Sequence, residues 1–174
     1  MQEVGQLRYF ILKKDERIHN YASIADAINK HQLWQSDEPI YCTYTVSAPQ
    51  RYIHFLPLLT CPVFAVNEST KKIFDIYQSG IKYRGLGLGD TSKQSLRTYY
   101  FMRPPIVDCL SKRTEFYMND SVKKLVLDQS KIEYDNVFTV KGVNGNYLIV
   151  SLIIVEALLA KKLNEFTFVE VECE

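Results

Sequence analysis

The chain has 174 residues, of which 47% are hydrophobic and 24% charged, and its formal net charge is +1. These values are typical of one globular domain with its own core, and they exclude a disordered chain. A net charge near zero gives no support to non-specific binding of nucleic acid or of an anionic membrane. We therefore expect a single domain over residues 1–174, with neither nucleic acid nor a membrane as its partner.

The sequence also lacks the features of targeting segments. Residues 1–5 contain no basic stretch followed by an apolar one, so no secretory signal is predicted. The apolar run from Leu148 to Ala160 contains Ser151 and Glu156, and it is shorter than the ~20 residues that span a bilayer. The four cysteines form no CxxC pair, which indicates reduced thiols rather than a zinc or redox site. These features predict a cytoplasmic protein.

The first third of the chain predicts two strands with a helix between them. Residues 9–12 and 40–46 are rich in the aromatic and β-branched types that favour a sheet. Between them, Ser23 with Asp26 three residues later resembles a helix N-cap, and apolar residues follow at helical spacing. The pattern predicts a helix over about 23–33, with His31 on its apolar side.

The middle of the chain predicts a second helix and then a hairpin. Asn67 is a suitable N-cap for an amphipathic helix, and Gly80 is suited to end it in the left-handed conformation. From Ile81 to Asp108 the glycines and prolines exclude a continuous helix and favour strands and turns. We interpret the glycine-rich stretch within this region as a flexible or bulged hairpin edge.

The last third predicts short strands, a tight turn, a buried helix that Ser151 caps and a final strand. Asn144-Gly145 is a strong turn signal between two apolar runs. The expected strands are 115–117, 125–127, 136–140, 147–150 and 166–171, and the expected helix runs from 152 to about 163. The acidic tail from Glu170 is interpreted as an alternating edge strand. Together the elements predict an α+β domain with a mixed or antiparallel sheet flanked by about three helices.

No pattern predicts a catalytic, metal or cofactor site. The stretch from Gly85 to Asp90 has the form GxGxG, without the helix or the Gly-Lys-Ser/Thr of phosphate-binding loops. His19, His31 and His54 lie at no metal-ligand spacing. Cys109 with the neighbouring Asp108 is a poor nucleophile pair, because adjacent strand residues point to opposite faces. We expect neither enzymatic activity nor a cofactor.

A set of short segments in the C-terminal part of the chain follows a recognisable pattern. These segments are Tyr99-Tyr100, Ile106-Val107-Asp108-Cys109-Leu110, Glu115-Phe116, Lys124-Leu125-Val126-Leu127-Asp128, Lys131-Ile132, Val137-Phe138, Ile149-Val150-Ser151 and Phe166–Val171. With them, roughly residues 62–171 resemble a bacterial polymorphic-toxin immunity family, immunity protein forty-three and its relatives. At three places the chain departs from the family, with Ser111 in place of an aspartate, Thr114 in place of a serine, and Leu152-Ile153 in place of acids.

This resemblance implies an antitoxin that binds a cognate toxin protein, encoded by an adjacent gene, and neutralises it by occlusion without a cofactor. The family offers no catalytic residues to transfer. Tyrosine and arginine are frequent anchors of protein interfaces, and they gather around the glycine-rich hairpin. The partner-binding residues expected on this hairpin are Tyr83, Arg84, Asp90, Lys93, Arg97 and Tyr99.

Two other functions stay open at this point. The first is a small nucleotide- or phosphate-binding protein that uses the Gly85–Asp90 loop, since closely spaced backbone amides can hold an anion. The second is a structural adaptor of a secretion or phage-derived assembly.

Overall fold

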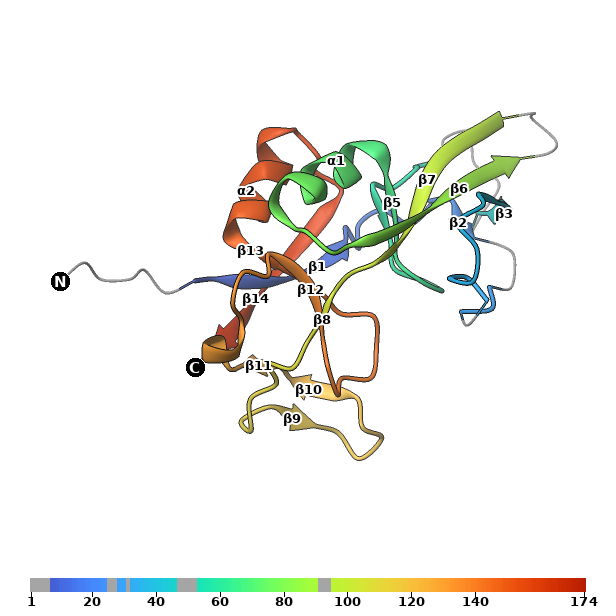
Figure 1. Ribbon diagram of the computed structural model, residues 1–174. Helices are drawn as coiled ribbons and strands as arrows, with labels where there is room; N and C mark the ends of the chain where they lie inside the picture. Colours follow the sequence, from blue (N-terminus) through green and yellow to red (C-terminus); the bar gives the residue numbers. More distant parts are fainter. Residues whose placement is uncertain (1–6, 25–27, 31, 47–52, 91–94) are drawn as a thin grey trace.

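The computed structural model describes residues 7–24, 28–30, 32–46, 53–90 and 95–174, in which two six-stranded sheets lie beside two α-helices (Figure 1). The elements are β1 (Tyr9–Lys14), β2 (Ser23–Ile24), β3 (Ile40–Thr45), β4 (Leu58–Leu59), β5 (Ala65–Asn67), α1 (Glu68–Tyr77), β6 (Lys82–Asp90), β7 (Ser95–Arg103), β8 (Ile106–Val107), β9 (Glu115–Phe116), β10 (Val122–Lys124), β11 (Val126–Leu127), the 3-10 helix η1 (Gln129–Lys131), β12 (Val137–Val140), β13 (Leu148–Ser151), α2 (Leu152–Ala160) and β14 (Phe166–Cys173).

The sheet that we call the C-terminal sheet has the strand order β11-β14-β1-β13-β12-β8. Its central strand β1 is antiparallel to both β13 and β14. The chain from β8 onwards joins the two ends of this sheet, because β8 pairs with β12 and Leu110 then bridges to Leu127 in β11. The sheet therefore curls around an interior that contains Phe138, Ile149 and Val171.

The other sheet, which we call the glycine sheet, has the order β2-β3-β6-β7-β5-β4. Strand β6 pairs antiparallel with β7 along its whole length and parallel with β3 on its other side. The hairpin is as predicted, but the glycine-rich stretch is a central strand and not an edge. The parallel pairing joins segments about 45 residues apart, and no local turn signal announces such a pairing.

Helix α1 begins where the sequence predicts, since Oδ1 of Asn67 accepts a hydrogen bond from the Thr70 amide at 2.9 Å. It ends at Tyr77, and Gly80 takes its positive φ of 81° beyond the helix end. Helix α2 also begins as predicted, but the hydroxyl of Ser151 makes no cap bond. Its Oγ instead bonds Oδ1 of Asn136 at 2.7 Å, which ties α2 to the start of β12.

The prediction of about three helices is corrected to two α-helices and one 3-10 helix in the described part of the chain. The expected helix over 23–33 fails at its start, because Ser23 and Ile24 form β2 and pair with Thr45 and Tyr44. Residues 25–27 and 31 of that helix lie outside the described residues. Pairing with β3 outweighs the local N-cap signal here, as tertiary context often does.

One apolar cluster joins the two sheets into a single α+β domain. It contains Phe10 and Leu148 from the C-terminal sheet, Met102 from the glycine sheet, and Phe74 and Leu158 from the two helices. No helix in the described ranges is both long and apolar enough to cross a membrane.

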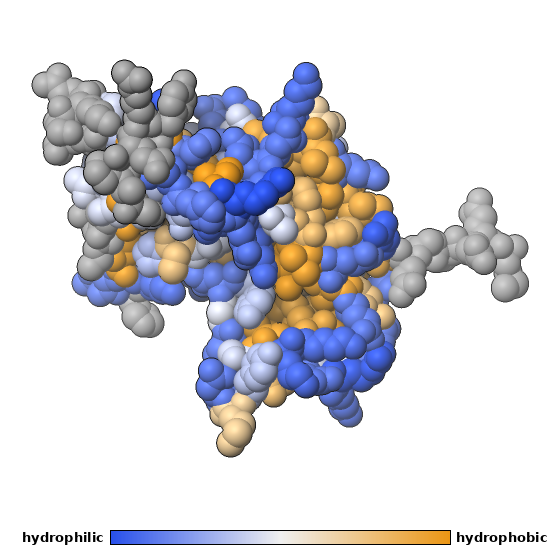
Figure 2. All heavy atoms as spheres, turned by 180° about the vertical axis from the view of Figure 1, so that it is seen from behind, coloured by the Kyte–Doolittle hydropathy of each residue, from blue (hydrophilic) through white to orange (hydrophobic). Residues whose placement is uncertain are grey.

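Helix α2 is less buried than its composition predicts. Ile154, Val155 and Leu158 are buried, whereas Ile153 is 44% exposed and Leu159 is 49% exposed. The helix packs on α1 and β13 and has solvent on its remaining side. Figure 2 shows hydrophobic residues gathered over the half of the molecule that carries α2 and the C-terminal sheet.

Candidate protein-binding surface

The partner-binding residues expected from the sequence do not share one surface. Residues directly opposite each other in the β6–β7 pair point to the same face, and alternate residues point to opposite faces. Tyr83 lies on one face of the glycine sheet. Arg84, Arg97 and Tyr99 lie on the other, which covers a second apolar cluster.

Tyr99 and Arg84 hold the fold together rather than face a partner. Tyr99 is only 2% exposed, its hydroxyl donates to the Leu56 carbonyl at 2.7 Å, and burial raises its pKa. Arg84 donates to the carbonyls of Glu38, at 2.6 Å, and Leu33, and so anchors the segment that leads into β3. The prediction that Tyr99 binds a partner is therefore wrong, because its side chain is buried. The guanidinium of Arg84 is already hydrogen-bonded to backbone carbonyls of the protein.

The remaining expected residues divide into one exposed, one half-buried and two that cannot be placed. Arg97 is exposed and stacks 4.9 Å above the ring of Phe55. Tyr83 is half-buried, packs edge-on against a neighbouring tyrosine ring, and has a pKa raised by burial. Lys93 lies outside the described residues, and so does the side chain of Asp90, although its backbone ends β6.

The structure reveals a different exposed surface on the Tyr83 side of the sheet. Gly85, Gly87 and Gly89 alternate along β6 and so share this face with their β7 partners Thr98 and Leu96. From β3, Tyr41 lies beside Gly87. We call this surface the glycine face, and it comprises Pro39, Tyr41, Gly85, Gly87, Gly89, Leu96 and Thr98.

The glycines allow a ring to lie directly on the backbone of the central strand. A Cβ atom at Gly87 would be 2.5 Å from Cδ1 of Tyr41 and 3.1 Å from Cδ1 of Leu96. Such distances exclude any side chain at this position unless its neighbours move. Tyr41 nevertheless remains 73% exposed and Leu96 58% exposed. The glycine face thus presents the side chains of Tyr41 and Leu96 to solvent, with both of them packed beside the backbone of Gly87.

Helix α1 marks the boundary of the glycine face. It covers the other half of the same sheet surface, where Tyr83, Tyr100 and Met102 pack against Phe74. Lys71 of α1 lies 4.5 Å above the ring of Tyr83. In the described part of the chain, no helix lies on the half beyond α1, where β6 carries the three glycines (Figure 1).

The same geometry argues against a phosphate site at Gly85–Asp90. A phosphate-binding loop offers several unpaired amides that converge on the anion. Here Gly87 and Gly89 sit between paired partners on both sides, Tyr41 and Thr43 in β3 and Thr98 and Leu96 in β7. Their peptide groups belong to the sheet and do not converge.

Cys109 has the properties of a core residue and not of a nucleophile. Its side chain is fully buried, and burial raises the pKa of its thiol to about 11, away from the thiolate form. The neighbouring Asp108 points outward and accepts a hydrogen bond from Nζ of Lys141 at 2.8 Å. Within the described ranges no three His, Cys, Asp or Glu side chains come together as metal ligands.

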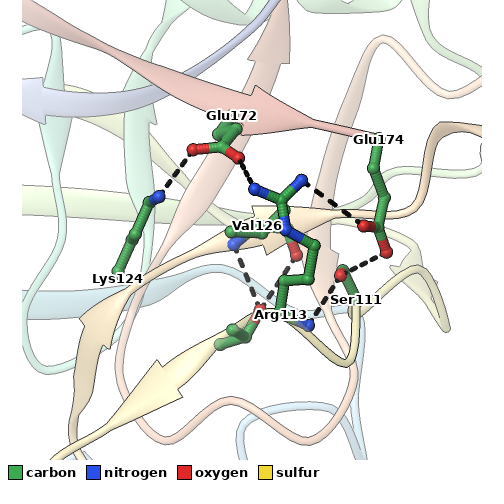
Figure 3. A network of polar contacts seen from close by, with 7 residues as sticks. Ser111, Arg113, Lys124, Val126, Glu172 and Glu174 are labelled. Carbon is green, nitrogen blue, oxygen red and sulfur yellow. Dashed lines mark hydrogen bonds and ion pairs between the residues drawn. The ribbon is translucent and has the colours of Figure 1, made fainter.

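The acidic tail is neutralised within the protein by a group of ion pairs (Figure 3). Glu172 accepts from Nη2 of Arg113 and from Nζ of Lys124, both at 2.6 Å. Arg113 also lies 3.6 Å from Glu174, which accepts a hydrogen bond from Ser111. The tail is therefore a bound strand and not a free acidic surface.

Thr114 adds two hydrogen bonds beside these ion pairs, and they link the residue before β9 to strand β11. Its Oγ1 donates to the Val126 carbonyl at 2.9 Å and accepts from the Val126 amide at 3.1 Å. Ser111 and Thr114, two of the positions at which the chain departs from the family pattern, thus both have structural partners here (Figure 3).

Sequence reasoning missed Tyr41, Leu96 and Thr98. The available signal was the alternation in β7, where Leu96, Thr98 and Tyr100 share a face that excludes Arg97 and Tyr99. Placing Tyr41 beside them required the parallel β3–β6 pairing. Comparison with protein-family models finds none that matches this chain, and comparison with curated proteins finds no match either.

Proposed function

We propose that this protein is an immunity protein that binds a toxin through the glycine face and occludes it. The observation that carries the proposal is the exposed pair Tyr41 and Leu96, which lie on either side of Gly87 on a face where β6 carries only glycines from 85 to 89. Tyrosine is among the residues that dominate the binding energy of many protein interfaces, and the buried core of an interface is more apolar than its rim, which suits a neighbouring leucine. The resemblance over residues 62–171 supplies the expected partner, a toxin encoded by an adjacent gene.

The near-neutral chain and its internally paired acids suit occlusion by shape rather than mimicry of a nucleic acid. Of the carboxylates in the last strand, Glu170 is paired with Arg8, and Glu172 with Arg113 and Lys124. The glycine face itself carries no charged side chain. The complex is therefore expected to depend weakly on salt, because few exposed charges cross the interface.

Co-expression with the product of the neighbouring gene tests this function. That product should stop growth alone, and this protein should restore growth and form a one-to-one complex. The double variant Y41A/L96A should weaken the complex at least about 30-fold, as loss of two hot-spot anchors does. The matched control is R97A, which removes an exposed side chain from the opposite face of β7.

Two outcomes contradict the proposal in different ways. A neighbouring product that is harmless alone, or equally toxic beside this protein, removes the immunity function. A complex that Y41A/L96A leaves intact, or that R97A weakens as strongly, retains the function but removes the glycine face as its contact surface.

A further inference from the structure

Strand β14 is paired along one side only for most of its length. On one side it pairs with β1 from Phe166 to Val171. On the other side β11 pairs with it only at Glu172 and Cys173. The stretch from Phe166 to Glu170 therefore has a free side in the described sheet, which we call the β14 edge.

The hydrogen-bond pattern fixes which backbone groups face outward along this edge. The Asp15 amide donates to the Glu165 carbonyl at 2.9 Å, so the odd-numbered residues of β14 bond to β1. Glu174, an even-numbered residue, faces the other way, because its amide donates to Leu127 and its carbonyl accepts from Gln129. The amides and carbonyls of Phe166, Phe168 and Glu170 consequently point away from β1.

No described residue bonds to these three outward-facing peptide units. The edge contains no lysine, proline or bulge, three features that protect many edge strands from pairing. The charge of its one acid, Glu170, is held by Arg8 at 2.6 Å. Val169 is 40% exposed beside the free backbone groups. Such an edge is a template for an additional strand.

We propose that the β14 edge receives an extended segment of the toxin as an added strand. This inference rests on the proposed function and names a second point of contact. The outward-facing amides and carbonyls belong to every second residue, Phe166, Phe168 and Glu170, so they are spaced at about twice the 3.4 Å rise of a strand. Only a peptide backbone in extended conformation presents the matching groups at that spacing, as in other cases of strand addition.

The structure limits the length of the added strand. Strand β11 already occupies the outer side of β14 at Glu172, so the incoming strand must end beside Glu170. It therefore spans about five residues, or roughly 17 Å at the rise of a strand. Side chains on its two faces would meet Phe168 on one side and Val169 on the other, and apolar residues suit both positions.

A second copy of this chain fits the edge less well. Two β14 edges could pair antiparallel with Phe168 at the centre, which places Asn164 of the copy opposite Glu172. At that position β11 already lies against β14. The turn that connects α2 to β14 in the copy would therefore collide with β11, whereas a short segment ending beside Glu170 would not.

A proline at position 170 tests the proposal with little effect on the fold. The Glu170 amide faces outward, so E170P removes one docking donor and places its ring in the path of the strand, without loss of a bond to β1. The variant E170A keeps the amide and removes the carboxylate that pairs with Arg8. With the neighbouring toxin as probe, E170P should weaken binding at least tenfold more than E170A does.

If E170P binds the toxin as tightly as the wild type does, the proposal that the β14 edge binds a toxin segment is wrong. It is also wrong if E170A loses as much affinity as E170P, because the loss would then come from the missing carboxylate. Both outcomes leave the proposed function intact. Absence of binding by the wild type removes the function itself. A dimer in sedimentation that E170P dissociates would assign the edge to a second copy and also overturn the proposal.

Amide hydrogen exchange supplies an independent measurement. In the free protein, the amides of Phe168 and Glu170 should exchange much faster than those of Thr167 and Val169, which bond to β1. In the complex, Phe168 and Glu170 should become protected while the other two change little. If the amides of Phe168 and Glu170 exchange as fast in the complex as in the free protein, strand addition is contradicted.

Discussion

The two sheets present different groups to solvent. On the glycine sheet these groups are side chains, because Tyr41 lies over Gly87 and, with Leu96, remains exposed. On the C-terminal sheet they are backbone groups, because β14 extends beyond β11 and its outward-facing peptide groups have no bonded partner among the described residues. A face of the first kind offers side-chain contacts to a partner, whereas an edge offers hydrogen bonds to a partner's backbone. Two halves of one domain thus differ in the kind of contact that they offer.

The largest effect on stability should come from a proline at position 169, next to the outward-facing amide of Glu170. In V169P the amide that is lost bonds to β1, so a strand hydrogen bond breaks and the carbonyl of the half-buried Ile11 loses its partner. We expect V169P to lower the free energy of unfolding by roughly 2–3 kcal/mol more than E170P does. Chemical denaturation of the two variants measures the difference. Equal stability would show that the alternation in β14 is misassigned.

The next largest effect on stability concerns the hydrogen bonds of Thr114, which hold β11 in place beside the end of the β14 edge. T114V keeps the shape of the side chain but leaves the amide of Val126 without a partner, while the Val126 carbonyl keeps only the bond that it accepts from the Ser111 amide at 3.0 Å. Val126 is fully buried, so we expect a loss of about 2 kcal/mol in the free energy of unfolding.

T114S is the matched control, since it retains the hydroxyl and should lose clearly less stability. If thermal or urea unfolding shows T114V to be as stable as T114S, then the hydrogen bonds of the Thr114 hydroxyl do not stabilise β11.

The glycine face can be tested by adding single methyl groups. G87A places a Cβ atom 2.5 Å from the Tyr41 ring, whereas in G85A the nearest atom is Cβ of Pro39 at 3.4 Å. We expect G87A to displace the ring and weaken toxin binding about tenfold, equivalent to about 1.4 kcal/mol. G85A should have a clearly smaller effect. Titration calorimetry compares the two, and similar affinities would indicate that the position of the Tyr41 ring does not matter.

The smallest effect is a pH dependence at Asp15, where β1 leaves the C-terminal sheet. Hydrogen bonds from Arg17 lower the pKa of Asp15 to about 2. Because the folded-state pKa lies below the ordinary value, Asp15 contributes stability above about pH 4 that is lost as pH falls towards 2. D15N should flatten the fall in melting temperature over this range. An unchanged pH profile in D15N would show that the pair with Arg17 contributes nothing.

Local signals predicted much of the secondary structure. The Asn67 cap, the start of α2 and the strands at residues 9–12 and 40–45 all appear where the sequence indicates them. The Asn144-Gly145 signal lies in the reversal between β12 and β13, with Gly145 at a φ of 129°, but this reversal is a longer loop in which Asn144 bridges to Ser121, and not the tight turn that was predicted. These features depend on hydrogen bonds and steric limits among residues close in sequence, which is why the sequence alone indicates them.

The candidate surface could be predicted only in part. The sequence directed attention to the β6–β7 hairpin, but it selected Tyr99, which is buried, and Arg84, which bonds the backbone of the segment before β3. It passed over Tyr41 because that residue lies more than 40 positions before Gly87. Which strand face is covered depends on the position of α1, and this is a property of the packed domain.

Patterns along the chain are sufficient to predict an α+β domain with a glycine-rich hairpin, a capped helix and an acidic, alternating last strand. They do not predict that the glycines lie in a central strand, that the Tyr41 ring lies over Gly87, or that β14 has no strand paired on its outer side at Phe168. Helix caps and turns are set by neighbours along the chain, whereas strand partners, exposed faces and open edges are set by pairings between distant segments.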